Sequence, residues 1–473
     1  MALWTRKQQQ ETSRSRQPDE EPASQYNRFL VYTATGVTAI GGLLFGFDTG
    51  VISGAVLFLK KDFALNSLTE EIAVSAILIG AIFGSAIAGK LSDALGRKLV
   101  ILSVCVIFAI GAILTAFSPN VWVFVAFRII VGFALGMDAV VAPVYISEIA
   151  PRNLRGGLVT INQFLLTVGI AVAYWTDLAF AHANLGWRPM FAVAAIPATI
   201  HFIVMLFLPD TPRWYASKDK WERAKQVLGR FVGEEKDEEL KIIRESVEAT
   251  KHSSARELFR PGLRMALIVG IGLAIFQQFV GINTIIYYAP TIFGYAGFTS
   301  ASGAILATSV VGVVNVLSTL VVIFLVDRVG RRPLLFVGLA GMLVTLIAIG
   351  LIFAFGPTHV GFLILVALIL YIISFAISLG PVYWLMSSEI FPNRLRGRGA
   401  SFAATSNWAA NLLVSITFLS LIGALGKPFT FWLYAVLAIA AFIFCWRFVP
   451  ETKGKRLEQI EAYWKNGRQW QNE

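Results

Sequence analysis

Ionisable side chains inside apolar segments are the first feature of this sequence that could do chemistry. Asp48 interrupts the glycine-rich run GGLLFGFDTGVISG, while Arg128 and Asp138 interrupt a later apolar run. Charges in such segments are costly, and they usually face a partner or a cavity. These residues are therefore candidates for binding a proton or an ion.

The composition indicates that they lie in a membrane protein. Of 473 residues, 56% are hydrophobic and only 15% are charged, and the mean hydropathy is +0.68, whereas soluble domains are about 25% charged. Apolar stretches long enough to cross a bilayer core of about 30 Å recur almost throughout. The net charge of +11 comes from basic residues clustered between these stretches, which argues against a nucleic-acid partner.

The stretches predict an all-α membrane protein with twelve transmembrane helices in two pseudo-symmetric six-helix bundles. The predicted spans are 29–59, 70–92, 98–117, 121–147, 157–180, 187–208, 262–293, 301–327, 333–355, 360–388, 397–423 and 428–449. We divide the chain into a disordered cytoplasmic tail (1–28), the first bundle (29–208), a linker (209–261), the second bundle (262–449) and a second tail (450–473). Helically spaced apolar residues in the linker predict short cytoplasmic helices, which serve either as a passive connection or as a gate. No cleavable signal peptide is expected at the N-terminus.

The distribution of Lys and Arg predicts the orientation. One set of short loops is rich in basic residues, namely Arg97, Lys98, Arg152, Arg155, Arg331, Arg332, Arg394, Arg396 and Arg398. The opposite set carries little beyond Lys60, Lys61, Arg188 and Lys427. The positive-inside rule therefore predicts that both termini and the central segment are cytoplasmic, in a multi-pass protein of the cell membrane.

The two halves of the chain repeat each other. SDALGRK (92–98) recurs as VDRVGRR (326–332), EIAPRNLRG (148–156) as EIFPNRLRG (389–397), and LPDTPR (208–213) as VPETKG (449–454). The paired motifs are separated by 234 or 241 positions. A duplicated six-helix unit with parallel repeats indicates a transporter whose substrate site lies between the halves, near the middle of the membrane.

Asp48 and Arg128 are predicted to lie at similar depth. Asp48 is about 11 residues below the outer end of its helix and Arg128 about 7 below the start of its own, at about 1.5 Å per residue. A pair offsets the cost of burying each charge, and an acid whose surroundings change can alternate between ionised and neutral forms. Such an alternation would couple transport to protons, while the simpler alternative is a static structural ion pair. One carboxylate beside a guanidinium is a poor sodium site.

The second half is rich in amides and aromatic residues. Its candidates are Gln277, Gln278, Asn283, Thr284, Tyr287, Tyr288, Asn315, Tyr383, Trp384, Asn407, Trp408 and Asn411, and the central portions of these helices carry no charge. Amides both donate and accept hydrogen bonds, and indole faces suit the C–H surface of a sugar ring. A neutral, hydroxyl-rich substrate fits this half, although for a lone amide such as Asn315 a hydrogen bond between helices is an equally good interpretation.

Charged residues at the cytoplasmic mouth form a candidate gate. Carboxylates and arginines recur there in both halves, at Asp93, Arg97, Glu148, Arg155, Asp327, Arg331, Glu389 and Arg396. They could form ion pairs in one conformation and lose them in another. The simpler interpretation is that they only set the topology, and the recurrence favours gating.

Nothing in the sequence indicates an enzyme, a metal site or a cofactor. Cys105 and Cys445 lie inside apolar segments, which is typical of buried free thiols. The four histidines are scattered, and no spacing matches a nucleophile with its base or a set of metal ligands.

The motifs together resemble the sugar porter family of the major facilitator superfamily. The resemblance runs from about Phe29 to Gly454 and is carried by GKLSDALGRK, PDTPRW, QQFVGIN, DRVGRRP, GPVYW and PETKG, together with the repeated E-I-x-P runs. It implies the major facilitator fold, alternating access, and transport of a monosaccharide or polyol such as a hexose, pentose or inositol. The expected partners are the sugar, a proton and the lipid bilayer, and the chain is expected to be monomeric.

The resemblance also assigns residues. It implies sugar contacts at Gln163, Gln277, Gln278, Asn283, Asn315, Trp384 and Asn407, with Phe45, Tyr287 and Trp408 lining the site. Proton-coupled members have an acid at the position of Asp48 and an arginine at that of Arg128, whereas passive facilitators typically have Asn in place of the acid. The resemblance therefore favours proton symport over passive facilitation. A sugar sensor and a drug exporter are less favoured.

Two positions depart from the family pattern. Ile170 stands where some proton-coupled relatives have Gln, and Asp138 stands where relatives usually have a small neutral residue. Asp138 is either a second carboxylate of the transport pathway or a paired structural acid.

Overall fold

The computed structural model describes residues 26–151, 154–232, 236–251, 255–356, 360–392, 395–455 and 457–470. Within these ranges, twelve segments are long and apolar enough to cross a membrane, as predicted. Their ends differ from the predicted ones by at most three residues. Nine are single helices: α2 (Arg28–Asp62), α3 (Ser67–Leu95), α4 (Arg97–Ala116), α5 (Val121–Ile149), α6 (Arg155–His182), α14 (Ala301–Val329), α15 (Arg331–Phe355), α18 (Arg396–Leu425) and α19 (Lys427–Phe448).

Three spans that the sequence predicted as continuous are broken. They are α7 and α8 (Arg188–Ala192 and Ala195–Leu206), α12 and α13 (Pro261–Phe279 and Ile282–Tyr295), and α16 and α17 (Gly361–Ala376 and Leu379–Glu389). The break before α13 falls at Gly281, whose φ of 89° is in the left-handed region that glycine adopts readily. Pro290 then kinks α13, with Tyr288 outside helical geometry. The break at Gly281 bends the chain between Gln278 and Asn283.

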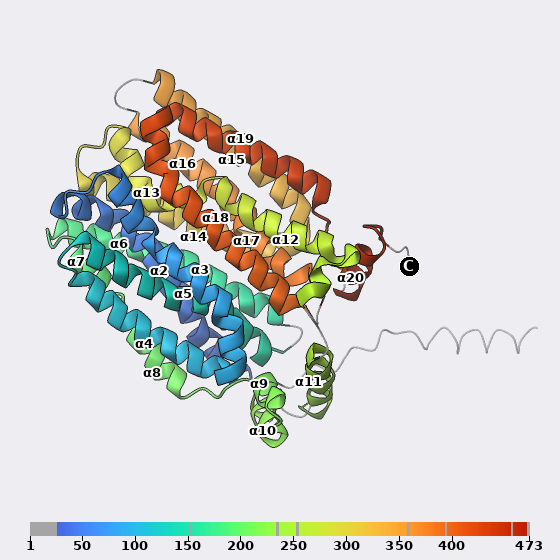
Figure 1. The fold of residues 1–473 in the computed structure, drawn as a ribbon. Helices are drawn as coiled ribbons and strands as arrows, with labels where there is room; N and C mark the ends of the chain where they lie inside the picture. Colours follow the sequence, from blue (N-terminus) through green and yellow to red (C-terminus); the bar gives the residue numbers. More distant parts are fainter. Residues whose placement is uncertain are drawn as a thin grey trace, which may run out of the picture.

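The first six spans and the last six form two bundles that lie side by side (Figure 1). In the first bundle α2 packs along α6 and α3 along α5; between the bundles α3 packs on α18 and α6 on α14. The connecting segment contains α9 (Pro212–Ser217), α10 (Trp221–Val232), α11 (Lys236–Lys251) and the 3-10 helix η2 (Ala255–Phe259). We call the end of the bundles that carries this segment the motif end. The last helix, α20 (Leu457–Lys465), packs against α12.

Glycines let α2 and α6 approach closely. Gly42, Gly46, Gly50 and Gly54 recur every four residues, so they share one face of α2. A Cβ added at Gly46 would overlap the backbone of Leu166 on α6, and one at Gly50 would come within 2.8 Å of the Ala173 Cβ. The glycine-rich run around Asp48 is therefore a packing surface.

The two bundles are joined by hydrogen bonds at the end opposite the motif end. Glu71 on α3 accepts hydrogen bonds from the backbone N–H (2.7 Å) and the hydroxyl (2.6 Å) of Ser420 on α18. The hydroxyl of Tyr174 on α6 donates to the carbonyl of Ile286 on α13 at 2.9 Å. These contacts, in the part of the chain that the structure describes, close the bundles together at the opposite end.

Candidate functional site

Asp48 and Arg128 form a buried ion pair between α2 and α5. Asp48 Oδ1 lies 2.5 Å from Arg128 Nη1, and both side chains are at most 4% exposed. The Arg128 guanidinium also lies 5.2 Å from the centre of the Phe191 ring, a cation–π contact. Asp48 Oδ2 and Arg128 Nη2 have no hydrogen-bond partner among the described residues. The pair is thus held by a single contact, which leaves polar atoms available to a water, a proton or a substrate.

A cavity opens beside this pair. Its lining includes Asp48 and Arg128 from the first bundle and Tyr287 and Trp408 from the second, and its empty volume, counted out to its mouth, is about 270 Å³. The enclosed part of this space holds about one water molecule, so the bundles must move apart here to admit a sugar. The rings of Phe45 and Trp408 meet across it with centroids 5.2 Å apart. The ion pair therefore borders the interface between the two bundles.

Four amides form one hydrogen-bonded cluster in the second bundle. Asn407 Nδ2 donates to Gln277 Oε1 at 2.7 Å, and Gln278 Nε2 donates to Asn407 Oδ1 at 3.1 Å. Asn283 Nδ2 donates to Gln278 Oε1 at 2.6 Å. The break between α12 and α13 makes this possible, because it brings Asn283 beside Gln278 only five positions earlier. A mutually bonded set of amides can exchange its internal bonds for bonds to hydroxyl groups.

The cluster is anchored to the other broken span and extended toward the cavity. Gln277 Nε2 donates to the carbonyls of Leu379 (3.1 Å) and Gly380 (3.2 Å), beside the start of α17. Asn411 Nδ2 contacts the Tyr287 hydroxyl at 3.3 Å. The buried Trp408 Nε1 has no partner among the described residues, so it is free to donate to a ligand.

Three predicted sugar contacts form no hydrogen bond with this cluster among the described residues. Asn315 on α14 lines a second cavity with Ile170 and Tyr174 from the first bundle. Gln163 on α6 is half-buried, and no hydrogen bond joins it to the four amides in the described parts of the chain. Trp384 on α17 packs on Tyr383 with ring centroids 4.8 Å apart.

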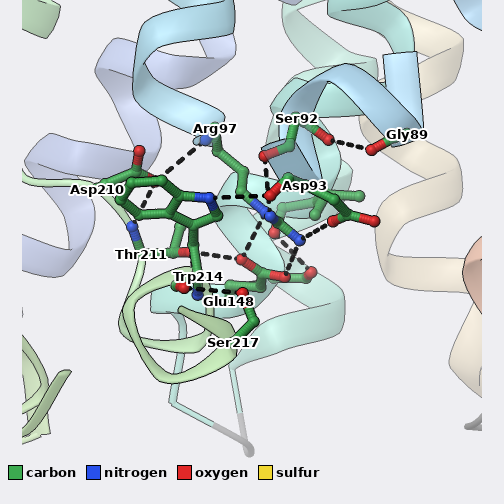
Figure 2. Close-up of polar contacts among 11 residues, drawn as sticks. Gly89, Ser92, Asp93, Arg97, Glu148, Asp210, Thr211, Trp214 and Ser217 are labelled. Carbon is green, nitrogen blue, oxygen red and sulfur yellow. Dashed lines mark hydrogen bonds and ion pairs between the residues drawn. The ribbon is translucent and has the colours of Figure 1, made fainter. Parts of the chain in front are cut away.

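At the motif end, Arg97 holds three helices of the first bundle together (Figure 2). Its guanidinium lies 2.8 Å from Asp93 Oδ1 and 3.1 Å from Glu148 Oε2, and it donates to the Ser92 carbonyl at 3.1 Å. These contacts join the end of α3, the start of α4 and the end of α5. Gly96, with a φ of 103°, makes the sharp turn that places Arg97 here.

Asp210 and Thr211, which directly precede α9, complete this cluster. The Thr211 hydroxyl donates to Glu148 Oε2 at 2.5 Å, and Asp210 Oδ1 accepts the N–H of Arg97 at 3.1 Å and that of Thr211 at 2.8 Å. Burial raises the pKa of Asp210 above its ordinary value, although the backbone N–H groups of Thr211 and Arg97 and the Arg97 charge oppose that rise.

The second bundle repeats the arrangement. Arg331 Nη2 lies 2.9 Å from Glu389 Oε1, the Thr452 hydroxyl donates to Glu389 Oε2 at 2.6 Å, and the Arg331 N–H donates to Glu451 Oε1 at 3.1 Å. Gly330 has a φ of 104°, matching Gly96. Each bundle therefore carries the same unit of arginine, glutamate, threonine and a second acid at its motif end.

The sequence interpretation overlooked four members of these units. Asp210, Thr211, Glu451 and Thr452 belong to the repeated LPDTPR and VPETKG motifs, whose common offset of 241 positions with Glu148 and Glu389 was the available signal. The side chains of Arg155 and Asp327, both predicted gate residues, lie outside what the structure describes. Arg396 is half-buried at the start of α18, and it interacts with another residue of the chain.

Comparison with known proteins gives the family. The family model described as "Sugar (and other) transporter" matches residues 34–464. The chain belongs to this sugar transporter family. It is 39% identical to the arabinose-proton symporter of Bacillus subtilis over 92% of this chain and 94% of that protein. Its identity to the galactose-proton symporter of Escherichia coli strain K12 is 38%, over 95% and 98% of the two chains.

Its fold matches that of a solved sugar transporter. The major facilitator superfamily proton:xylose symporter XylE, bound to 6-bromo-6-deoxy-D-glucose, superposes with a TM-score of 0.80 and 35% identity, over 93% of this chain and 100% of that chain. The predicted major facilitator fold and the sugar porter resemblance are thereby confirmed. This sugar transporter is a multi-pass membrane protein and not an enzyme.

Proposed function

We propose that this sugar transporter carries a neutral monosaccharide or polyol together with a proton, by alternating access. The Asp48–Arg128 pair is the observation that carries this proposal. It is a buried acid–base pair on the wall of a cavity between two bundles that must move relative to each other. The relatives named as arabinose-proton and galactose-proton symporters support the same function.

Asp48 is the proton acceptor in this proposal, and Arg128 stabilises its ionised form. When Asp48 takes up a proton, the neutral acid no longer holds the guanidinium, which frees α2 and α5 to shift with the bundles. The intact pair seen here corresponds to the carrier after proton release.

The amide cluster is the proposed sugar site. Gln277, Gln278, Asn283 and Asn407 are the primary contacts, because their hydrogen bonds to one another can be replaced by bonds to sugar hydroxyls. Phe45, Tyr287 and Trp408 would line the bound sugar from the cavity. Gln163, Asn315 and Trp384 would join the site in a conformation that rearranges the bundles.

The motif end is proposed to face the cytoplasm, in the cell membrane. Basic residues such as Arg97, Lys98, Arg331 and Arg332 gather there, as the positive-inside rule requires. Both tails then lie in the cytoplasm, and the predicted division into two bundles, a linker and two tails is retained. The arginine units act as cytoplasmic gates that hold each bundle in one arrangement. Each monomer contains a complete site.

Uptake by the purified protein in proteoliposomes tests this function. Labelled sugar is offered with and without an inward proton gradient, and hexoses, pentoses and inositols compete for uptake. We expect accumulation above the outside concentration only with the gradient, and competition from one class of neutral sugar. Equilibration without accumulation would instead identify a passive facilitator.

A further inference from the structure

Asp138 differs from the other buried carboxylates of the first bundle because it has no partner. Asp48 is paired with Arg128, Glu70 lies 2.8 Å from Lys60, Glu71 accepts two hydrogen bonds from Ser420, and Asp177 accepts the N–H of Gly54 at 3.1 Å. Asp138 is only 5% exposed, and no hydrogen bond or ion pair joins it to any described residue. A buried acid without a donor or a cation is far more stable in its neutral, protonated form.

Asp138 lies outside the cavity beside Asp48 and Arg128. It lies on the interface of α2 and α5 that also holds the Asp48–Arg128 pair, but faces the backbone of α2 at Gly41, where an added Cβ would overlap its carboxylate. Gly41 is seven residues from Asp48, or about 10 Å along α2 toward the motif end. Asp138 does not line the cavity beside that pair.

Among the described residues, no cationic side chain pairs with Asp138 and neutralises its carboxylate in place of a proton. The described titratable and charged groups on its own helix α5 are Arg128, Tyr145 and Glu148. Those on the helices packed around it are Arg28, Tyr32, Asp48, Lys60, Lys61 and Asp62 on α2; Glu70, Glu71, Lys90 and Asp93 on α3; Arg97, Lys98 and Cys105 on α4; and Tyr174, Asp177 and His182 on α6. Cys105 is within electrostatic reach of Asp138, and Arg97 is bound to Asp93 and Glu148. On α8, which packs against α2 and α4, both ring nitrogens of the buried His201 lack a partner among the described residues.

We propose that Asp138 is a second proton-binding site, distinct from the coupling pair, whose protonation stabilises the conformation that is closed at the opposite end. When the proton leaves, the O–H bond breaks, its electron pair stays on the carboxylate, and water takes the proton. The resulting anion is unpaired at the tight contact with Gly41, so it favours separation of α2 from α5. If the motif end is cytoplasmic, as the proposed function has it, an acidic cytoplasm slows the cycle through this site.

A conformational measurement tests this proposal independently of transport. Ile286 is 8% exposed at the closed end, so an Ile286→Cys reporter in a variant lacking Cys105 and Cys445 reacts with a maleimide only when that end opens. The reactivity of the thiol itself depends on pH, and Leu185→Cys, at a position 57% exposed, corrects for this. Asp48→Asn is included in every protein, which removes the coupling acid from the titration.

We expect the corrected labelling rate of the Asp48→Asn reporter to rise with pH, by up to tenfold per pH unit, the limit for one proton. Adding Asp138→Asn should hold the rate low at every pH, because the amide stays neutral. His201→Phe added instead should leave the pH dependence in place. A pH-independent rate without the Asp138 change, or a pH dependence that survives Asp138→Asn, would overturn the proposal. Proton-driven uptake by the wild-type protein tests the transport function separately, so the two can fail independently.

Discussion

Asp48 on α2 and Arg128 on α5 are 80 positions apart in the chain, yet their charged atoms lie 2.5 Å from each other, and both side chains are at most 4% exposed. The pair stands where the first bundle meets the second, next to the Phe45–Trp408 contact. Breaking a buried pair by removing one partner costs about 3–5 kcal/mol. Losing this ion pair when Asp48 is protonated therefore changes the free energy by enough to shift a conformational equilibrium.

The arginine units at the motif end should differ in how much they stabilise the fold. The Glu148 side chain is 7% exposed and that of Glu389 is 19% exposed. Glu148→Gln should therefore lower the free energy of unfolding in detergent more than Glu389→Gln does. The expected loss in Glu148→Gln, the more buried of the two, is up to about 3–5 kcal/mol. Equal shifts in the two variants would show that burial does not govern these units.

The contact between Glu71 and Ser420 should keep the opposite end closed. Hydrogen bonds to a charged group contribute about 1.5–3 kcal/mol each, and about 1.4 kcal/mol corresponds to a tenfold change in population. Glu71→Ala should therefore raise labelling of the Ile286→Cys reporter roughly tenfold or more. Ser75→Ala is the matched control, because its hydroxyl bonds only to the backbone carbonyl of Glu71 on the same helix. Unchanged labelling in Glu71→Ala would remove this contact from the closure of the bundles.

The close approach of α2 to α6 should make Gly46 intolerant of a side chain. Gly46→Ala forces a Cβ against the backbone of Leu166, so it should lower thermal stability by at least about 1–3 kcal/mol. Gly36, on the same helix, has no atom within 4 Å of an added Cβ. Gly36→Ala should thus be neutral or stabilising by up to about 1 kcal/mol, since alanine favours the helix. Similar melting temperatures for the two variants would contradict the packing described here.

Gln278 and Asn315 should contribute unequally to sugar affinity. Gln278 bonds to both Asn283 and Asn407, so Gln278→Ala removes a contact and disorders two others. We expect its KM for the transported sugar to rise roughly tenfold, with a smaller rise for Asn315→Ala, whose residue lines the separate cavity. A larger effect at Asn315 would move the proposed site toward α14.

The sequence predicted the features that depend on local pattern. Hydropathy located the twelve spans, and the internal repeat anticipated the two matching units at Arg97 and Arg331. The depth argument predicted that Asp48 and Arg128 lie at similar depth, because helix rise and span ends alone determine depth.

Features that depend on the packing of distant helices could not be predicted. The contact from Glu71 to Ser420 joins residues 349 positions apart, and neither belongs to a repeated motif. The breaks at Gly281 and Ser378 lie inside spans that are apolar throughout. Hydropathy averaged over a whole span therefore predicts one continuous helix and does not reveal the break. Which amides meet therefore became visible only in three dimensions.

The most direct test of proton coupling compares two modes of transport by Asp48→Asn in proteoliposomes. Exchange of labelled for unlabelled sugar needs no net proton movement, whereas accumulation driven by an imposed pH gradient does. If Asp48 carries the proton, the variant keeps exchange within a few-fold of the wild-type rate and loses accumulation altogether. Accumulation at the wild-type level in Asp48→Asn would contradict the account.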